Sequence, residues 1–386
     1  MNILENLIRS EEPFILYKTN IGFKLYTQFS RKIILNEKNI KGFLNSIKKK
    51  KSNFKETDLF VGFFGYEILN NLIGIKLPKQ KSINFPKGIF YKPEKVQNLK
   101  DIHYKNDKEK KTYTKFKINL SLNNYTKIFE KFKKKIKSGD TYQIKICTKY
   151  KNNSIIDPLD LFSKLCKTNL APESFFIKDK DYSIISCSPE NLIDRRGNFI
   201  STKPIAGTLK KNKKLNKSKA LKYFRKNIKE TKEHNMIVDM ERNDLSRICV
   251  PGTVKIKKEK KIEEYKDLFH YVTLIAGRLR KNIKIIDIIK SMMPGGSVIG
   301  CPKISTLNLL NNQEKENRNI YTGSFGFIKF NRDMRFNIII RSLLYYKSIS
   351  EISVASGVVV DSKAKNEFNE NFIKAKALLD LFKWFI

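Results

Sequence analysis

The stretch NNYTKIFEKFKKKIKSGDTYQIKICTKY, residues 123–150, changes its hydrophobic period halfway along. Its first half has apolar residues at the spacing of one helix face, and these are Tyr125, Ile128, Phe129, Phe132 and Ile136. Ser138 and Gly139 then end the helical pattern. The second half, TYQIKICTKY, alternates like a strand, which places Gln143 and Lys145 on one face. The stretch therefore predicts a helix followed by a strand.

The rest of the chain extends this pattern in both directions. Further strands are predicted at FILYKTN (14–20), FKLYTQF (23–29), LFVGFFGYE (59–67), YSIISCSP (182–189), NFISTKP (198–204), FGFIKF (325–330), RFNIIIRSLLYY (335–346) and ISVASGVVV (352–360). Helices are expected at 217–240, 284–293, 303–311 and 364–383. Because strands follow one another like hairpins with helices inserted between them, we expect an α+β fold built on antiparallel sheets. A polar, charged segment at 98–115 divides the chain into an N-terminal region, 1–115, and a larger region, 116–386.

Composition narrows the classes of protein. The formal net charge is +40, but the lysines are spread along the whole chain and accompany much isoleucine and asparagine, so we expect no nucleic-acid partner. The apolar runs are far shorter than the roughly 20 residues of a membrane span, and the N-terminus lacks the apolar core of a signal peptide. The five cysteines are scattered without metal-ligand spacing, which is typical of reduced thiols. We therefore expect a cytoplasmic protein with no membrane contact.

Two lysine-rich segments carry paired carboxylates. KETKEHNMIVD (229–239) holds Glu230 and Glu233, and NEFNENFIKAK (366–376) holds Glu367 and Glu370. On a helix, residues three apart share a face, so each pair is able to act on one target. Two such pairs from distant helices are suited to a divalent cation, since Mg²⁺ takes one or two protein carboxylates and completes its shell with water and substrate. The alternative for each pair alone is an ordinary surface pair.

Three short motifs add candidate groups. PIAGT (204–208) and PGGSVIGCPK (294–303) present backbone N–H groups that are able to cradle carboxylates, or are ordinary tight turns. SPE (188–190) places Glu190 just after a strand, where it is suited to act as a general acid. Neither glycine motif fits a nucleotide fingerprint, and three histidines offer little for a zinc site.

Six segments in order make the chain resemble the chorismate-utilising enzyme family. They are SPENLIDRRGNFISTKPIAGT, KEHNMIVDMERNDLSR, HYVTLIAG, PGGSVIGCPK, YTGSFGF and ASGVVVDSKAKNEFNENFIKAK. The resemblance covers about 116–386, together with GFFGYE (62–67). It implies a β-sandwich of two large antiparallel sheets flanked by helices, to which the N-terminal region contributes strands.

The resemblance also implies site roles. Mg²⁺ would be held by Glu233 and Glu370, with Glu230 and Glu367 beside them. Glu190 would be the general acid for departure of the C4 hydroxyl of chorismate. Gly207, Thr208 and Gly357 would contact the substrate, and His270 would line the pocket. Tyr321, Arg341 and Lys374 would hold the substrate carboxylates, a task that suits the planar fork of arginine.

The strand TYQIK indicates whether water or ammonia is the nucleophile that attacks chorismate. Family members that add water use a lysine base at the position of Gln143, and an amide cannot take a proton from water. We therefore expect an aminating enzyme, with Lys145 on the same face as a possible substitute base. No glutaminase motif is legible, so ammonia is expected from a separate glutamine amidotransferase subunit.

The product is less sharply indicated. The double glycine of PGGSVIGCPK resembles aminodeoxychorismate synthases, and no LLES segment for tryptophan binding is found. Against this, Ala206 stands where some of these synthases carry a nucleophilic lysine, and Ala355 and Ser356 replace glycines usual in the family. We expect component I of aminodeoxychorismate synthase, with anthranilate synthase component I as the alternative.

Overall fold

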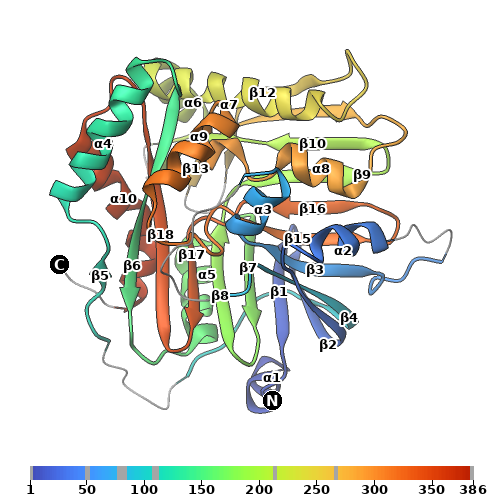
Figure 1. The fold of residues 1–386 in the computed structure, drawn as a ribbon. Helices are drawn as coiled ribbons and strands as arrows, with labels where there is room; N and C mark the ends of the chain where they lie inside the picture. Colours follow the sequence, from blue (N-terminus) through green and yellow to red (C-terminus); the bar gives the residue numbers. More distant parts are fainter. Residues whose placement is uncertain are drawn as a thin grey trace.

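The computed structural model describes residues 3–47, 53–75, 85–106, 113–211, 215–264 and 268–382, without the side chains of residues 206, 208, 210, 228–230 and 268. The described strands are β1 Phe14–Thr19, β2 Gly22–Ile34, β3 Leu59–Phe64, β4 Gly88–Leu99, β5 Lys117–Ile118, β6 Gln143–Asn152, β7 Glu173–Lys178, β8 Tyr182–Ser188, β9 Asn191–Arg196, β10 Phe199–Lys203, β11 Ile205–Lys210, β12 Lys255–Glu264, β13 Leu268–Arg278, β14 Gly300–Cys301, β15 Ser324–Lys329, β16 Met334–Asn337, β17 Ser342–Tyr346 and β18 Ile349–Val358. The helices are α1 Ile3–Arg9, α2 Ile40–Ser46, α3 Tyr66–Leu72, α4 Leu122–Lys137, α5 Pro158–Asn169, α6 Lys217–Lys226, α7 Ile228–Ser246, α8 Ile285–Met292, α9 Lys303–Gln313 and α10 Ala364–Leu379, with short 3₁₀ turns at Gly296–Val298 and Asp380–Phe382. The order and types of these elements confirm an α+β fold (Figure 1).

The described strands pair side by side into one antiparallel ribbon. From β6, which pairs with β5 and β14 along one edge, the ribbon continues through β18, β17, β8, β7, β1 and β2. It then runs through β4, β3, β15, β16, β9, β10 and β13, and β13 also pairs with β11 and β12. Strands β1 to β4 of the N-terminal region therefore lie in the middle of the ribbon, between β7 and β15.

The ribbon folds back on itself to form two packed layers. Phe175 of β7 stacks on Phe325 of β15 with the ring centroids 3.8 Å apart. One buried cluster joins side chains from β1, β7, β8 and β17 with others from β3, β4 and β15. This arrangement confirms the predicted sandwich, whose two sheets are joined through β1 and β2.

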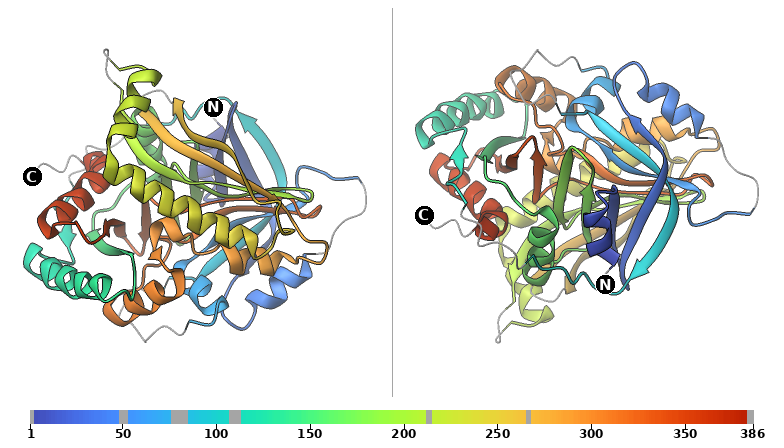
Figure 2. Two further views of the ribbon diagram at one scale, coloured as in Figure 1. Left: turned by 90° about the horizontal axis from the view of Figure 1, so that it is seen from above. Right: turned by 90° about the horizontal axis from the view of Figure 1, so that it is seen from below.

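Alternating residues of the strands face different cores. Phe175 faces the opposite layer, whereas its neighbour Phe176 packs with Phe162 of α5 on the outer face. Both faces of β7 and β8 are buried, although serines and a glutamate stand among their apolar residues. Helices α5 and α10 cover this outer face, and α4 lies beside α10, where Tyr125 contacts Phe368 (Figure 2). A second core joins side chains from α2, α3, α4, α8 and α9.

The first quoted stretch folds as its pattern predicts. Helix α4 ends at Lys137, Ser138 is its C-cap, and Gly139 has a φ of +81° that favours glycine. The long helix expected at 217–240 is instead α6 and α7, because Asn227 has extended backbone between them. The single strand expected at 335–346 is also wrong: β16 and β17 are separated by a bend at which Arg341 has a φ of +51°.

Other differences concern short motifs. PIAGT does not form a tight turn, because most of it belongs to β11, which pairs with β13. GYE, expected to end a strand, begins α3 after β3 stops at Phe64. Within the described ranges, no helix is both long and apolar enough to cross a membrane.

Candidate active site

The two acidic segments meet at the start of strand β6. Gln143 Nε2 donates to Glu233 Oε1 of α7 at 2.8 Å, and Lys145 Nζ lies 3.0 Å from the same oxygen. Burial raises the pKa of Glu233, but the ammonium of Lys145 and the amide of Gln143 outweigh it and bring the pKa to about 2. Glu233 is therefore an ionised carboxylate held by two donors from one strand.

Helix α10 brings the second pair to the same place. Glu370 Oε1 lies 2.7 Å from Lys374 Nζ, which also donates to the carbonyl oxygen of Ala355 on β18 at 2.9 Å. Burial alone would raise the pKa of Glu370, but Lys374 and Lys145 lower it below its usual value, and Glu233 partly opposes them. Because Glu233 and Glu370 act on each other, the acidic groups of two distant helices share one site.

Glu367 lies deeper than Glu370 on the same helix. Its side chain is buried, and Ser362 Oγ donates to Glu367 Oε1 at 2.8 Å. It acts on the ammonium of Lys145 more weakly than Glu233 and Glu370 do. The side chain of Glu230, the fourth predicted metal ligand, lies outside the described residues.

Gly357 leaves room for the two donors of β6. It pairs with Lys145 across the β18–β6 ladder. A Cβ at Gly357 would lie 2.7 Å from Gln143 Nε2 and 2.8 Å from Lys145 Nζ, closer than real Cβ atoms approach. Gly357 therefore lies against the side chains that bind Glu233, and its contact with substrate stays a prediction.

Glu190 follows β8 and is fully enclosed. Ser297 Oγ of the PGGSVIGCPK segment donates to Glu190 Oε1 at 2.8 Å. Burial raises the pKa of Glu190 to about 7, although Ser297, Lys145 and Arg341 favour the ionised form. A carboxyl group with this pKa is a suitable proton donor near neutral pH.

Arg341 and His270 lie near this acid. Arg341 occupies the bend before β17, and its carbonyl oxygen accepts from the backbone N–H of Cys187 at 3.2 Å. Burial and the positive charge of Arg341 lower the pKa of His270 to about 4, so this imidazole is neutral. Gly207 of β11 hydrogen-bonds to His270 through its backbone. Thr208 pairs with His270 in the strand register, and its side chain lies outside the described residues.

Tyr321 forms a small buried cluster with Cys147 and Ala355. Arg318 stacks over the Tyr321 ring at 5.8 Å and donates from Nη2 to the carbonyl oxygen of Lys145 at 3.1 Å. Arg318 is completely buried and forms a two-point ion pair with Glu314. It links Tyr321 to the strand that carries Lys145.

Sequence reasoning did not single out Ser297 or Arg318. Ser297 stood inside a quoted glycine-rich segment, and a hydroxyl in such a segment is a signal for a side-chain donor. Arg318 precedes the YTGSFGF motif with no local pattern to mark it. Both roles depend on partners more than 100 residues away in the sequence.

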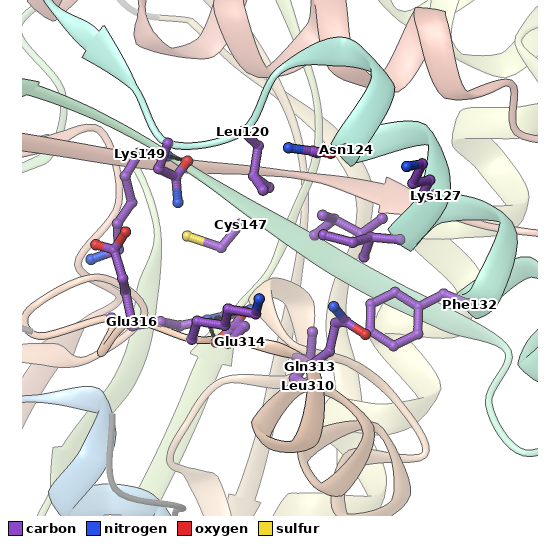
Figure 3. A pocket seen from close by; sticks show the side chains of 15 residues that line it. Leu120, Asn124, Lys127, Phe132, Cys147, Lys149, Leu310, Gln313, Glu314 and Glu316 are labelled. Carbon is purple, nitrogen blue, oxygen red and sulfur yellow. Dashed lines mark hydrogen bonds and ion pairs between the residues drawn. The ribbon is translucent and has the colours of Figure 1, made fainter. Parts of the chain in front are cut away.

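A cavity of about 450 Å³ lies between α4 and the middle of β6 (Figure 3). Side chains from α4, β6, the end of α9 and the loop that follows it line the cavity, including Cys147, Lys149 and Glu314. Gln143, Lys145 and Glu233 do not line it. In the acidic site, Glu233 is paired with Lys145 and Glu370 with Lys374.

The residues present fit a magnesium ion. In the part of the chain that is described, no three histidine, cysteine, aspartate or glutamate side chains gather as a ready-made metal cage. Glu233 and Glu370 nevertheless supply two ionised carboxylates from separate helices, which is the number that Mg²⁺ commonly takes from a protein. The other positions would then belong to water and to acidic groups of the substrate.

Comparison with known proteins defines the class. Residues 11–380 match the family described as chorismate binding enzyme, and the chain belongs to this family. The chain is 34% identical to aminodeoxychorismate synthase component 1 of Bacillus subtilis (strain 168) over 66% of its own length, and it spans 54% of that relative. It is 31% identical to an anthranilate synthase component I-like protein of Synechocystis sp. (strain ATCC 27184 / PCC 6803 / Kazusa) over 83% of its length and 72% of that relative.

Solved structures support the same fold. Anthranilate synthase component I from Streptococcus pneumoniae TIGR4 matches with a TM-score of 0.75 and 25% identity, over 94% of this chain and 89% of that one. The menaquinone-specific isochorismate synthase from Escherichia coli matches with a TM-score of 0.77 and 15% identity, over 99% and 91% of the two chains. The family predicted from the six ordered segments is confirmed.

Proposed function

We propose that this chain aminates chorismate to 4-amino-4-deoxychorismate, in a Mg²⁺-dependent reaction with ammonia from a glutamine amidotransferase partner. The presence of Gln143 is the observation that favours amination of chorismate over addition of water. This residue stands at the strand position where water-adding members of the family have a lysine base, and its amide is bound to Glu233. Ammonia is a stronger nucleophile than water and attacks without first losing a proton, so it needs no such base.

Lys145 does not replace the missing base. Burial lowers the pKa of Lys145, but Glu233, Glu370 and Glu367 outweigh it, so the pKa is raised and the side chain stays an ammonium. A protonated amine cannot accept a proton from water. The ion pair of Lys145 with Glu233 therefore supports amination as well.

The mechanism follows from the enclosed acid. A C–N bond forms between ammonia and the ring, and the C4–O bond breaks. Glu190 gives its proton to the leaving hydroxyl, which departs as water, and the proton released by the new amine restores Glu190. Arg341 and Lys374 would bind the two carboxylates of chorismate. Glu233 and Glu370 would hold Mg²⁺, which supplies positive charge that orients the dianion and stabilises the transition state.

Two observations on sequence favour attachment of nitrogen at C4. They are the double glycine at Gly295 and Gly296 and the similarity to aminodeoxychorismate synthase component 1 of Bacillus subtilis. Anthranilate synthase component I remains the alternative, since several such proteins are equally similar, with 35% identity for the Buchnera aphidicola subsp. Pemphigus spyrothecae protein.

The product identifies the reaction. Purified protein is incubated with chorismate, Mg²⁺ and ammonium. We expect a product that yields 4-aminobenzoate only when aminodeoxychorismate lyase is added. Anthranilate fluorescence without the lyase would instead establish the alternative.

The magnesium assignment is tested separately. Glu233→Gln should lower turnover by at least about 100-fold, because it removes one of two charged ligands. The control is Glu130→Gln on the exposed face of α4, which should match the parent. An active Glu233→Gln variant would remove Glu233 from the metal site.

The partner is tested with glutamine as nitrogen donor. We expect turnover with glutamine only after a glutamine amidotransferase subunit is added, whereas ammonium supports the chain alone. Glutamine-dependent turnover by the chain alone would contradict the proposed partner.

A further inference from the structure

Lys145 forms an ion pair with Glu233, the carboxylate that would bind the metal ion in the proposed function. Its Nζ and the Nε2 of Gln143 both bind Glu233 Oε1, at 3.0 and 2.8 Å. The side chain of Lys145 is 10% exposed and that of Glu233 is 26% exposed. The ammonium of Lys145 is therefore largely shielded from solvent, and it is not easily released from Glu233 without another anion to replace it.

The backbone fixes Lys145 in this position. Its N–H donates to the carbonyl oxygen of Ile299 at 3.0 Å, and its carbonyl oxygen accepts from Arg318 at 3.1 Å. Gly357, which lacks a Cβ, leaves the space that the ammonium fills. The strand therefore holds a positive charge at the centre of the acidic site.

This charge interacts with every acidic group described in the site. Glu233, Glu370 and Glu367 stabilise the ammonium of Lys145, and Lys145 in turn acts on Glu190. A divalent cation bound to Glu233 and Glu370 would lie next to this ammonium, and two positive charges at such a distance repel each other. Lys145 therefore opposes the binding of a cation for as long as it stays paired with Glu233.

We propose that Lys145 is an internal counter-ion that competes with the divalent cation for Glu233 and couples cation binding to substrate binding. Once displaced, the ammonium stays inside an enclosed site and needs another anion. A carboxylate of the dianionic substrate supplies one. The cation and the dianion then bind together, each favouring the other. This inference rests on the proposed function, because it takes Mg²⁺ and a dicarboxylate as the ligands.

The test measures cation binding directly. Mg²⁺ is titrated calorimetrically into the full chain without ammonium or glutamine, first alone and then with saturating chorismate. Lys145→Met should bind Mg²⁺ about tenfold more tightly than the parent when chorismate is absent, a change typical of coupled sites. Chorismate should lower the Kd for Mg²⁺ in the parent. The factor by which it lowers this Kd should be about ten times smaller in Lys145→Met.

Three variants serve as controls. Lys145→Arg keeps the positive charge and should bind Mg²⁺ within about threefold of the parent. Lys151→Met removes a lysine farther along β6, which pairs with Glu316, and should leave Mg²⁺ affinity unchanged. Lys145→Gln is a second neutral variant, measured in case methionine prevents folding, which thermal unfolding followed by circular dichroism would detect.

The outcomes separate the two proposals. If the parent binds Mg²⁺ with chorismate, but neutral variants of Lys145 match its affinity within twofold in both titrations, the competition is refuted and the proposed function stands. If the parent shows no Mg²⁺ binding even with chorismate, the proposed function fails, and this inference fails with it.

Discussion

Glu190 is the residue whose surroundings most directly suggest proton transfer. Burial raises its pKa to about 7, so about half of the molecules carry the proton at that pH. A general acid must be protonated, and at a fixed concentration of free ammonia kcat/KM should therefore be highest below pH 7 and fall as the pH rises through about 7. Glu190→Gln should lower kcat by about 100- to 10,000-fold, the usual contribution of such a group. Steady-state rates across pH 5.5–9 check both expectations, and a parent profile flat through this range would contradict the role of Glu190.

Ser297 sets the environment of that acid. Its hydroxyl donates to Glu190 and favours the ionised form. In Ser297→Ala the pKa of Glu190 should rise, which moves the alkaline limb of the kcat/KM profile to higher pH, and loss of orientation should lower the maximum by up to about tenfold. Ser297→Thr keeps the hydroxyl and should retain the parent midpoint. An unchanged midpoint in Ser297→Ala would show that the hydrogen bond does not influence the acid.

At the residue scale, the identity of the acidic site residues could be predicted from the sequence, but their contact partners could not. Glu190 and the glutamates of α7 and α10 stand in ordered motifs, so their part in the site could be expected from sequence. The contact of Lys145 with Glu233 could not, because it joins a strand to a helix 88 residues away. Even the helical spacing of Glu367 and Glu370 did not reveal that one is buried and bound to Ser362 while the other pairs with Lys374.

At the scale of elements, the ladder between β6 and β18 positions the two donors to Glu233. Gly357→Ala should push the ends of Gln143 and Lys145 away from Glu233, because its Cβ would come within 3 Å of both. We expect kcat/KM to fall by at least about tenfold, since small misplacements in a site are costly to catalysis. Thermal stability should change little, because the crowded atoms are the far ends of flexible side chains.

The matched control for this substitution is Gly42→Ala in α2. A Cβ at Gly42 meets nothing within 4 Å, so activity should equal that of the parent. The prediction about Gly357 is wrong if the two variants have the same kcat/KM.

Helices and strands with a clear hydrophobic period and stop residues were predicted correctly from the sequence. Elements that depend on tertiary contacts were not. Helix α4 has a regular apolar face and clear stop residues. The break between α6 and α7 has no glycine or proline to announce it. Strand β12 is largely exposed and lysine-rich, so its sequence lacks the apolar alternation of a strand, and it forms by pairing with β13.

For the whole molecule, the contact between the two layers is a large source of stability. Phe175 and Phe325 are fully buried and stacked on each other. Phe175→Ala should reduce the free energy of unfolding by about 3–5 kcal/mol, the usual cost of removing a buried ring. Phe199→Ala, at a ring that is 65% exposed, should change it by less than about 0.5 kcal/mol. Denaturant unfolding of both variants measures the difference, and equal losses would contradict this account of the core.

The position of β1 to β4 in the middle of the ribbon leads to a second prediction for the whole molecule. A chain of residues 116–386 loses β1 to β4, which leaves one edge of β7 and one edge of β15 unpaired and exposes the inner core. We expect it to aggregate and to lack a cooperative unfolding transition, because unpaired apolar strand edges associate. Co-expression with residues 1–115 should restore a folded complex. A monomeric, cooperatively unfolding 116–386 chain would contradict this expectation and support the division at residue 115 as a true domain boundary.

The sequence by itself determined the family, the α+β class and the carboxylates to examine, because ordered motifs and hydrophobic periods are properties of neighbouring residues. Only the tertiary structure decided how Glu233 and Glu370 are placed in one site. It also decided that Ser297 donates a hydrogen bond to Glu190 and that Lys145 forms an ion pair with Glu233. The physical reason is that charge, burial and hydrogen bonding act across a few ångströms of space. Contacts such as those between β6, α7 and α10 form only when strands distant in sequence have paired and the helices have packed against them.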